Sequence, residues 1–285
     1  MFVRVTILLF LLSLFVVGEK TTVTMRVYSS RENPQWYLEG PERVKFLSFA
    51  DPLVGKEQHD CNRFASTLGY TGFEIRDPSL PKCLYVANNK EVETILLASY
   101  IKMRTRSNDD LNNILQVADH VAEVIQSGVV TELYTEFQNI PLSANEIIRG
   151  PDNVTRYNPD KWNKDITALR YNNCYNYATD VRTDTFAQPG KGSGSEYKSS
   201  TCTETWPASI RDGLTPLEKV CPTKEHPSVG HYVSLVIWPH QDFHWYRKDL
   251  DGFWSHKPGS TPVRNYDSSQ QKILNPDKAN IKPYT

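Results

Sequence analysis

The chain has 285 residues, and its 32 Lys and Arg residues against 33 Asp and Glu residues give a formal net charge of -1. This balance argues against a basic protein that coats nucleic acid. With 39% hydrophobic and 23% charged residues, the composition is that of a folded globular protein rather than a disordered one. The length allows one large domain or two ordinary ones.

The first residues carry the one long apolar stretch of the sequence. Residues 5–17 are almost entirely apolar, follow Arg4 and precede Gly18. A stretch of this length is shorter than the roughly 20 residues that a membrane-spanning helix needs. The pattern predicts a secretory signal peptide over residues 1–18, with a membrane anchor as the alternative. We therefore expect a secreted, extracellular protein with no membrane span in the mature chain.

Secretion determines how the five cysteines are interpreted, because an oxidising compartment favours disulfides. Two local pairs are expected, Cys61 with Cys83 and Cys202 with Cys221, which leaves Cys174 as a free thiol. A free thiol in a secreted protein is reactive, buried or part of a bridge between chains. The tripeptide Asn153-Val154-Thr155 is a glycosylation sequon in a polar stretch, so Asn153 is the expected glycosylation site.

The pattern of apolar residues changes along the chain and predicts two parts. Residues 19–85 are weakly patterned and loop-rich, whereas residues 91–104 and 111–125 carry apolar residues at spacings of three and four, as in helices. The polar stretch around residues 150–165 suits a boundary. We expect a mostly helical region over residues 19–150 with a local disulfide, and a second domain over residues 151–285.

The second domain is expected to contain a small antiparallel sheet. The β-branched and aromatic run 232–238 ends at a proline and predicts a buried strand. Residues 243–248 and 253–256 predict a hairpin around a turn at 249–252. The chain is therefore expected to have an α+β fold.

The unpaired cysteine lies in the run Tyr171-Asn-Asn-Cys-Tyr-Asn-Tyr-Ala178. If a helix begins near Cys174, its N–H groups and positive dipole end would lower the thiol pKa and hold an oxyanion. His231, at the start of the predicted strand, is the candidate base. The alternative for Cys174 is a small buried residue, and for His231 a polar strand end.

A third group would orient the imidazole, and Asp242, His244 and His256 are the candidates. With the turn at 249–252, Trp245 faces His256 across the hairpin, so His244 and His256 lie on opposite faces. We prefer His244, because it opens the strand after the one that His231 begins. Its alternative is an ordinary strand histidine.

The same region suggests two other kinds of site. His226, His231, His240, His244 and His256 fall within 31 residues. None of their spacings gives His-x-x-x-His on a helix, because the segment is predicted to be strand and turn, so no metal is expected. The dense aromatic residues of the hairpin could line a groove, although they more often indicate a packed sheet.

The order of these parts resembles papain-like cysteine hydrolases of the NlpC/P60 and CHAP type. The resemblance rests on Asn-Asn-Cys-Tyr-Asn-Tyr-Ala, then Gly-His-Tyr-Val-Ser-Leu-Val-Ile, then Asp-Phe-His-Trp-Tyr-Arg, and covers residues 165–275 at most. The context Asn-Cys-Tyr-Asn departs from the family's usual Asp-Cys-Ser or Asn-Cys-Thr-Trp. Cys174, His231 and His244 fall in the places that such proteins give to a nucleophile, a base and a third polar residue.

The resemblance implies a papain-like domain that cleaves an amide bond of a peptide or peptidoglycan stem, without a cofactor, through a thioacyl intermediate. Cys174 would be the nucleophile, His231 the base, His244 or Asp242 the orienting residue, and Asn173 or backbone N–H groups the oxyanion donors. The main alternative is a non-catalytic secreted binding or toxin-like protein that uses the aromatic hairpin as a recognition surface.

Overall fold

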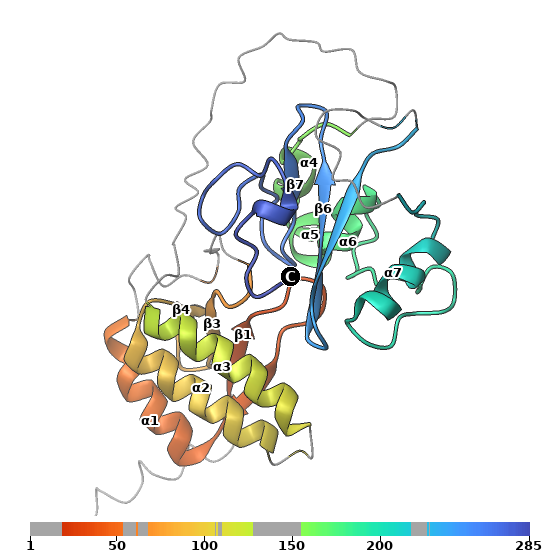
Figure 1. Cartoon of the computed structure of the whole chain (residues 1–285). Helices are drawn as coiled ribbons and strands as arrows, with labels where there is room; N and C mark the ends of the chain where they lie inside the picture. Colours follow the sequence, from red (N-terminus) through yellow and green to blue (C-terminus); the bar gives the residue numbers. More distant parts are fainter. Residues whose placement is uncertain are drawn as a thin grey trace, which may run out of the picture.

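The computed structural model describes most of the chain outside the first 18 residues. The described residues are 19–53, 61, 68–105, 107, 110–127, 155–217, 227 and 229–285. The predicted signal peptide (residues 1–18), the predicted glycosylation site Asn153 and the cysteine Cys221 lie outside them. The described part combines helices with two antiparallel sheets, so the fold is α+β as predicted (Figure 1).

The N-terminal part contains a sheet that the sequence did not predict. Its order is β2-β1-β3-β4, and every neighbouring pair is antiparallel. The strands are β1 (Thr21–Arg26), β2 (Gln35–Leu38), β3 (Gly72–Arg76) and β4 (Leu84–Val86). These strands are short, and polar residues such as Thr21 and Arg26 are buried in β1. This combination weakens the alternation of apolar and polar residues that identifies a strand from sequence.

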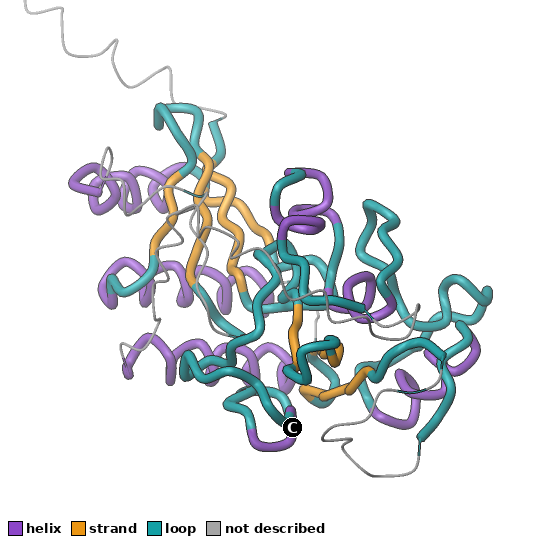
Figure 2. The backbone as a smooth tube through the Cα atoms, turned by 90° about the horizontal axis from the view of Figure 1, so that it is seen from above, coloured by secondary structure: helices purple, strands orange, loops and turns teal. Residues whose placement is uncertain are grey.

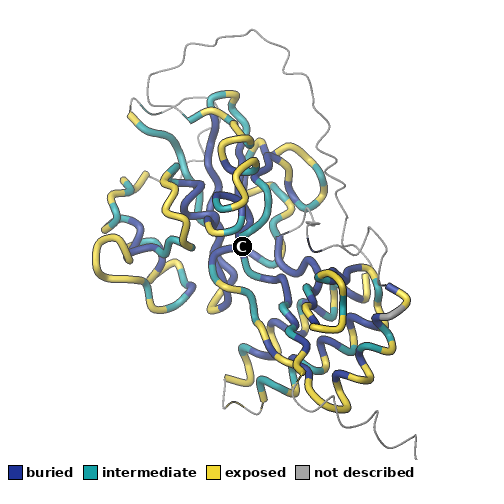
Figure 3. The backbone as a smooth tube through the Cα atoms, turned by 180° about the vertical axis from the view of Figure 1, so that it is seen from behind, coloured by how far each residue is buried: buried dark blue, intermediate teal, exposed yellow. Residues whose placement is uncertain are grey.

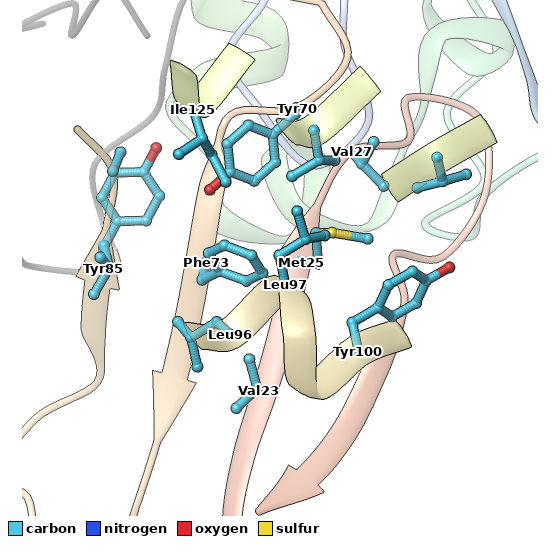
Figure 4. Close-up of a cluster of buried hydrophobic side chains, with 14 of the residues drawn as sticks. Val23, Met25, Val27, Tyr70, Phe73, Tyr85, Leu96, Leu97, Tyr100 and Ile125 are labelled. Atoms are coloured by element: carbon cyan, nitrogen blue, oxygen red, sulfur yellow. The ribbon is translucent and has the colours of Figure 1, made fainter. Parts of the chain in front are cut away.

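Three helices cover one face of this sheet (Figure 2). They are α1 (Gly40–Ala50), α2 (Lys90–Thr105) and α3 (Leu111–Ser127), and a short 3-10 turn, η1 (Asp51–Leu53), follows α1. α3 buries Ile114, Val117, Val121 and Ile125, which the predicted helical spacing places on one side. Figure 4 shows side chains of the strands and helices meeting in the resulting core.

The C-terminal part is built on a second sheet, of order β5-β6-β7. Its strands are β5 (Val233–Trp238), β6 (Asp242–Lys248) and β7 (Trp254–His256). Four short helices accompany it: α4 (Asp160–Asn163), α5 (Ile166–Tyr171), α6 (Cys174–Thr179) and α7 (Cys202–Arg211). A 3-10 turn, η3 (Pro276–Lys278), lies in the C-terminal tail. α6 packs against β6, and β6 and β7 are buried along their whole length; Figure 3 colours the backbone by burial.

The two parts share one hydrophobic core. A single cluster contains Phe73 and Val121 from the N-terminal part together with Trp238, Trp254 and Tyr284 from the C-terminal part. The C-terminus lies between the two parts (Figure 1). The boundary expected near residue 150 therefore separates segments of sequence that pack together in space. Within the described residues, no helix is both long enough and apolar enough to cross a membrane.

Candidate functional site

Helix α6 begins at Cys174, as the sequence predicts, and Asn173 caps it. The Asn173 side-chain oxygen accepts from the backbone N–H groups of Tyr175 and Asn176, both at 3.1 Å. Its amide nitrogen donates to the carbonyls of Ser30 (2.9 Å) and Ala187 (2.8 Å). Both polar atoms of the side chain are thus occupied. The predicted role of Asn173 as an oxyanion donor is wrong, because the fold uses this residue to start the helix.

Cys174 is a core residue in this structure. Its side chain is fully buried and packs with Ile237, Phe243 and Trp245, and its sulfur lies 3.9 Å from the Phe243 carbonyl oxygen. Burial raises the pKa of the Cys174 thiol far above its usual range, more than the nearby backbone N–H groups lower it. The thiolate that a nucleophilic cysteine requires is therefore not formed at neutral pH.

His231 lies at the opposite end of α6 from Cys174. Its Nε2 is 2.5 Å from the carbonyl oxygen of Ala178, so Nε2 carries the proton of this hydrogen bond. Four residues of helix, roughly 6 Å of rise, separate Ala178 from Cys174. The predicted pair of Cys174 and His231 is therefore not formed. Burial lowers the pKa of His231, and the residue lines a pocket to which Cys174 does not contribute.

Asp242 accepts hydrogen bonds from two distant segments rather than orienting a histidine. Its carboxylate receives the N–H of Ser29 (2.6 Å), the N–H of Ser30 (3.2 Å) and the hydroxyl of Tyr284 (2.5 Å). The hydroxyl of Ser30 also donates to it. Burial raises the pKa of Asp242, and these hydrogen bonds partly offset that shift. The predicted role of Asp242 is replaced by a structural one.

The hairpin has a register that differs by one residue from the predicted one. The N–H of Asp249 bonds to the carbonyl of Phe253, and Tyr246 rather than Trp245 lies opposite His256. A shift of one residue moves a side chain to the other face of a sheet. His244 and His256 therefore lie on the same face, with Nε2 of His244 2.8 Å from Nδ1 of His256.

The two histidines form a hydrogen-bonded chain of fixed direction. Nε2 of His256 is 2.9 Å from the Tyr266 carbonyl oxygen, which can only accept, so that nitrogen carries a proton. In a neutral imidazole Nδ1 of His256 then accepts from His244, whose own Nδ1 accepts from the Ser29 hydroxyl at 3.0 Å. Burial lowers the pKa of both histidines well below the usual value. His244 is therefore a neutral structural residue and not the orienting group of a catalytic base.

Lys257 is a further buried titratable group, outside the residues predicted to form the catalytic site. Its Nζ donates to the carbonyl oxygens of Leu169 (2.6 Å), Asn172 (2.7 Å) and Gly259 (2.6 Å). Burial lowers the pKa of Lys257 to about 7. The lysine thereby ties the end of α5 to the segment after β7. Leu169 and Ser29 could not be identified as partners from local spacing, because Leu169 lies 88 residues before Lys257 and Ser29 lies 213 residues before Asp242.

The aromatic hairpin is part of the core. Phe243, Trp245 and Tyr246 are fully buried, and Trp238 and Trp254 are nearly so. A recognition surface needs accessible rings, and these rings are not accessible in the structure. Its aromatic density reflects a sheet packed on both faces.

The structure describes four of the five cysteines. Cys61 is bonded to Cys83, whereas Cys202 is a free, exposed thiol at the start of α7. The structure thus shows no bridge at Cys202, and its expected partner Cys221 lies outside the described residues. Among the described residues, the side chains of Cys61, Glu74 and Cys83 lie close enough together to be considered as ligands of one metal ion. Both cysteines, however, belong to the disulfide.

Native thiol labelling should separate Cys174 from Cys202. We expect an alkylating reagent to modify Cys202 in the folded protein and to leave Cys174 unmodified until the protein unfolds, because a buried thiol with a raised pKa is unreactive. The measurement is mass spectrometry of peptides after timed alkylation. Labelling of Cys174 as fast as Cys202 would contradict the buried position.

A pocket lies beside β5. Its volume is about 1010 Å³, and its walls come from the end of α6, from α7 and the segment that follows it, and from residues 229–235. His231 is the one predicted catalytic residue among its lining residues. The pocket therefore does not bring His231 together with Cys174 or with the other residues predicted to form a catalytic site.

Comparisons with known proteins agree with this structural reading. No family profile matches the chain, and no solved structure matches it. Insoluble matrix shell protein 1 of Ruditapes philippinarum is 45% identical over 133 residues, which are 46% of this chain and 84% of that protein. The relative is a shell matrix protein and not a hydrolase, so the predicted cysteine peptidase activity is wrong. The chain belongs to the family of insoluble matrix shell protein 1.

Proposed function

We propose that this protein is a non-catalytic structural component of an extracellular matrix. The observation that carries the proposal is its 45% identity to a shell matrix protein, over most of that protein's length. The predicted secretion of the chain and its disulfide between Cys61 and Cys83 agree with an extracellular location. The resemblance to NlpC/P60 and CHAP proteins stays a prediction that these comparisons do not address.

The positions of the supposed catalytic residues support the same conclusion. Asn173 caps a helix, Cys174 fills the core, and Asp242 joins separate segments of the chain. Residues that are fully buried and fully hydrogen-bonded stabilise a fold and cannot contact a substrate.

The proposal is tested by fractionation of the material that the source organism secretes. An antibody against the chain should find it in the insoluble matrix, released by denaturant and reductant but not by salt. The purified protein should also be retained when mixed with washed matrix, and the Cys174→Ala variant should be retained equally well. Recovery of the chain only in the soluble secreted fraction, with no retention by the matrix, would overturn the proposal.

A further inference from the structure

The outer edge of β5 is covered by backbone along only one half of the strand. At the covered end, Ile237 exchanges both of its backbone hydrogen bonds with Thr285, at 3.0 and 2.9 Å. Because the N–H and C=O groups of alternate residues point to the same side of a strand, those of Val233 and Leu235 also point away from β6. Among the residues that the structure describes, none is hydrogen-bonded to these outward groups of Val233 and Leu235.

The burial of β5 changes where the backbone cover ends. Residues 236–238 are buried, whereas residues 233–235 are half-buried. The pocket of about 1010 Å³ runs along residues 233–235. Pockets of roughly 300–1,000 Å³ enclose small ligands, so this one has room for several residues of an extended chain. The outward groups of this half of β5 therefore lie beside a space that can hold a ligand.

The pocket has walls on both faces of the sheet. Trp206 and Leu214 line it and pack on the same side as Val233 and Leu235. Trp254 lines it from the core on the other side, and its buried indole N–H has no acceptor among the described residues. An extended chain beside β5 would direct alternate side chains toward the two walls, because successive side chains of a strand point to opposite faces. The shape of the pocket thus suits a single extended chain.

The pattern of polar groups favours a peptide over an apolar small molecule as the occupant. Val233 and Leu235 each present one donor and one acceptor, and this repeat is the one that the backbone of another strand satisfies. Three exposed apolar residues also line the pocket: Val181, Leu217 and Val229, with 55%, 59% and 75% of their surface accessible. Apolar side chains of a bound peptide would cover them.

The charges around the pocket restrict the peptide further. The described lining residues include two carboxylates, those of Asp212 and Asp277, and no lysine or arginine. Complementary charges favour association and like charges oppose it. The pocket therefore favours an uncharged or basic segment over an acidic one.

We propose that the groove along residues 233–235 of β5 binds an extended, apolar, uncharged or basic peptide segment as an added antiparallel strand. Thr285 occupies the place opposite Ile237, so the bound segment begins opposite Leu235. Its residues opposite Leu235 and Val233 each exchange two backbone hydrogen bonds with β5. The main chain supplies affinity, and the two walls select the side chains. This inference goes beyond the proposed function and does not depend on it, because the binding takes place in solution.

Isothermal titration calorimetry of the full mature protein with the synthetic peptide Val-Lys-Val-Thr-Ser-amide tests the proposal. The first valine takes the place opposite Leu235, the lysine that opposite Ser234 and the second valine that opposite Val233. The protein should bind this peptide, and the peptide with glutamate in place of lysine should bind roughly threefold more weakly. Absence of binding by the lysine peptide would overturn the proposal.

N-methylation of the peptide tests the strand pairing without any change to the protein. In the proposed register the N–H of the second valine donates to Val233, whereas the N–H of the lysine points away from β5. Methylation of the valine nitrogen should weaken binding roughly tenfold or more, and methylation of the lysine nitrogen should change it by less than about twofold. The two methylated peptides have the same composition, so each is the control for the other. Equal affinities of the two would overturn the pairing.

A variant of the protein tests the same hydrogen bonds from the other side. Val233→Pro removes the outward N–H and should weaken binding of the unmodified peptide roughly tenfold. Proline is tolerated at the first residue of an edge strand, where the missing N–H faces away from β6. Val233→Thr keeps the N–H and the β-branched shape, so it is the control and should bind within about twofold of the wild type. Unchanged binding by the proline variant would overturn the proposed register.

Discussion

Replacing Asp242 by alanine should lower the free energy of unfolding by about 3–5 kcal/mol. The carboxylate accepts from the backbone N–H groups of Ser29 and Ser30 and from the hydroxyls of Ser30 and Tyr284, all in a fully buried place. The hydroxyls can rotate toward other acceptors, but the two amides cannot. In the alanine variant these donors stay buried without a partner, which is the costly case for a polar group.

The measurement is denaturant unfolding of the purified protein, followed by far-ultraviolet circular dichroism. Asp242→Asn keeps the shape and one accepting oxygen but directs an amide toward donors, so its loss should lie between that of alanine and the wild type. Glu196→Ala, at an exposed position, is the control and should leave stability unchanged. A loss below about 1 kcal/mol for Asp242→Ala would show that the fold does not depend on this carboxylate to hold Ser29, Ser30 and Tyr284 against β6.

The elements that could be predicted from the sequence are those with a strong local signal. The apolar spacing of residues 111–125 predicts α3, and the β-branched run at 232–238 predicts β5. The start of α6 at Cys174 was also predicted. In each case neighbouring residues carry the information, so no knowledge of distant contacts is needed.

The candidate site failed for a physical reason that can be stated from its residues. A helix that begins at a cysteine is equally compatible with a reactive thiol and with a buried one, and only the packing of Phe243 and Trp245 decides between them. The register of the hairpin determines on which face of the sheet His256 lies. Because the register differs by one residue from the predicted one, His256 lies on the same face as His244 and not on the opposite face. Ser29, which bonds to both Asp242 and His244, lies more than 200 residues earlier in the chain.

The pair of His244 and His256 should make the protein sensitive to acid. Both imidazoles are held neutral, with pKa values well below 6.5 in the folded state, whereas in the unfolded chain they return to about 6.5. Below that pH the unfolded state binds more protons than the folded one. The free energy of unfolding therefore falls as the pH drops, by up to about 1.4 kcal/mol per pH unit for each histidine.

The stability of a double variant, His244→Gln with His256→Gln, should depend less steeply on pH below 6.5. Glutamine offers a donor and an acceptor as neutral histidine does, but it takes up no proton. Asp249, whose pKa burial raises to about 6, opposes the histidines in the same range, so the wild-type and variant curves must be compared rather than one curve interpreted alone. His240→Gln, at an exposed histidine, is the control. Parallel curves for the wild type and the double variant would show that the pair does not titrate on unfolding. A shallower curve for the double variant alone would identify these two imidazoles, rather than surface histidines, as the origin of the acid sensitivity.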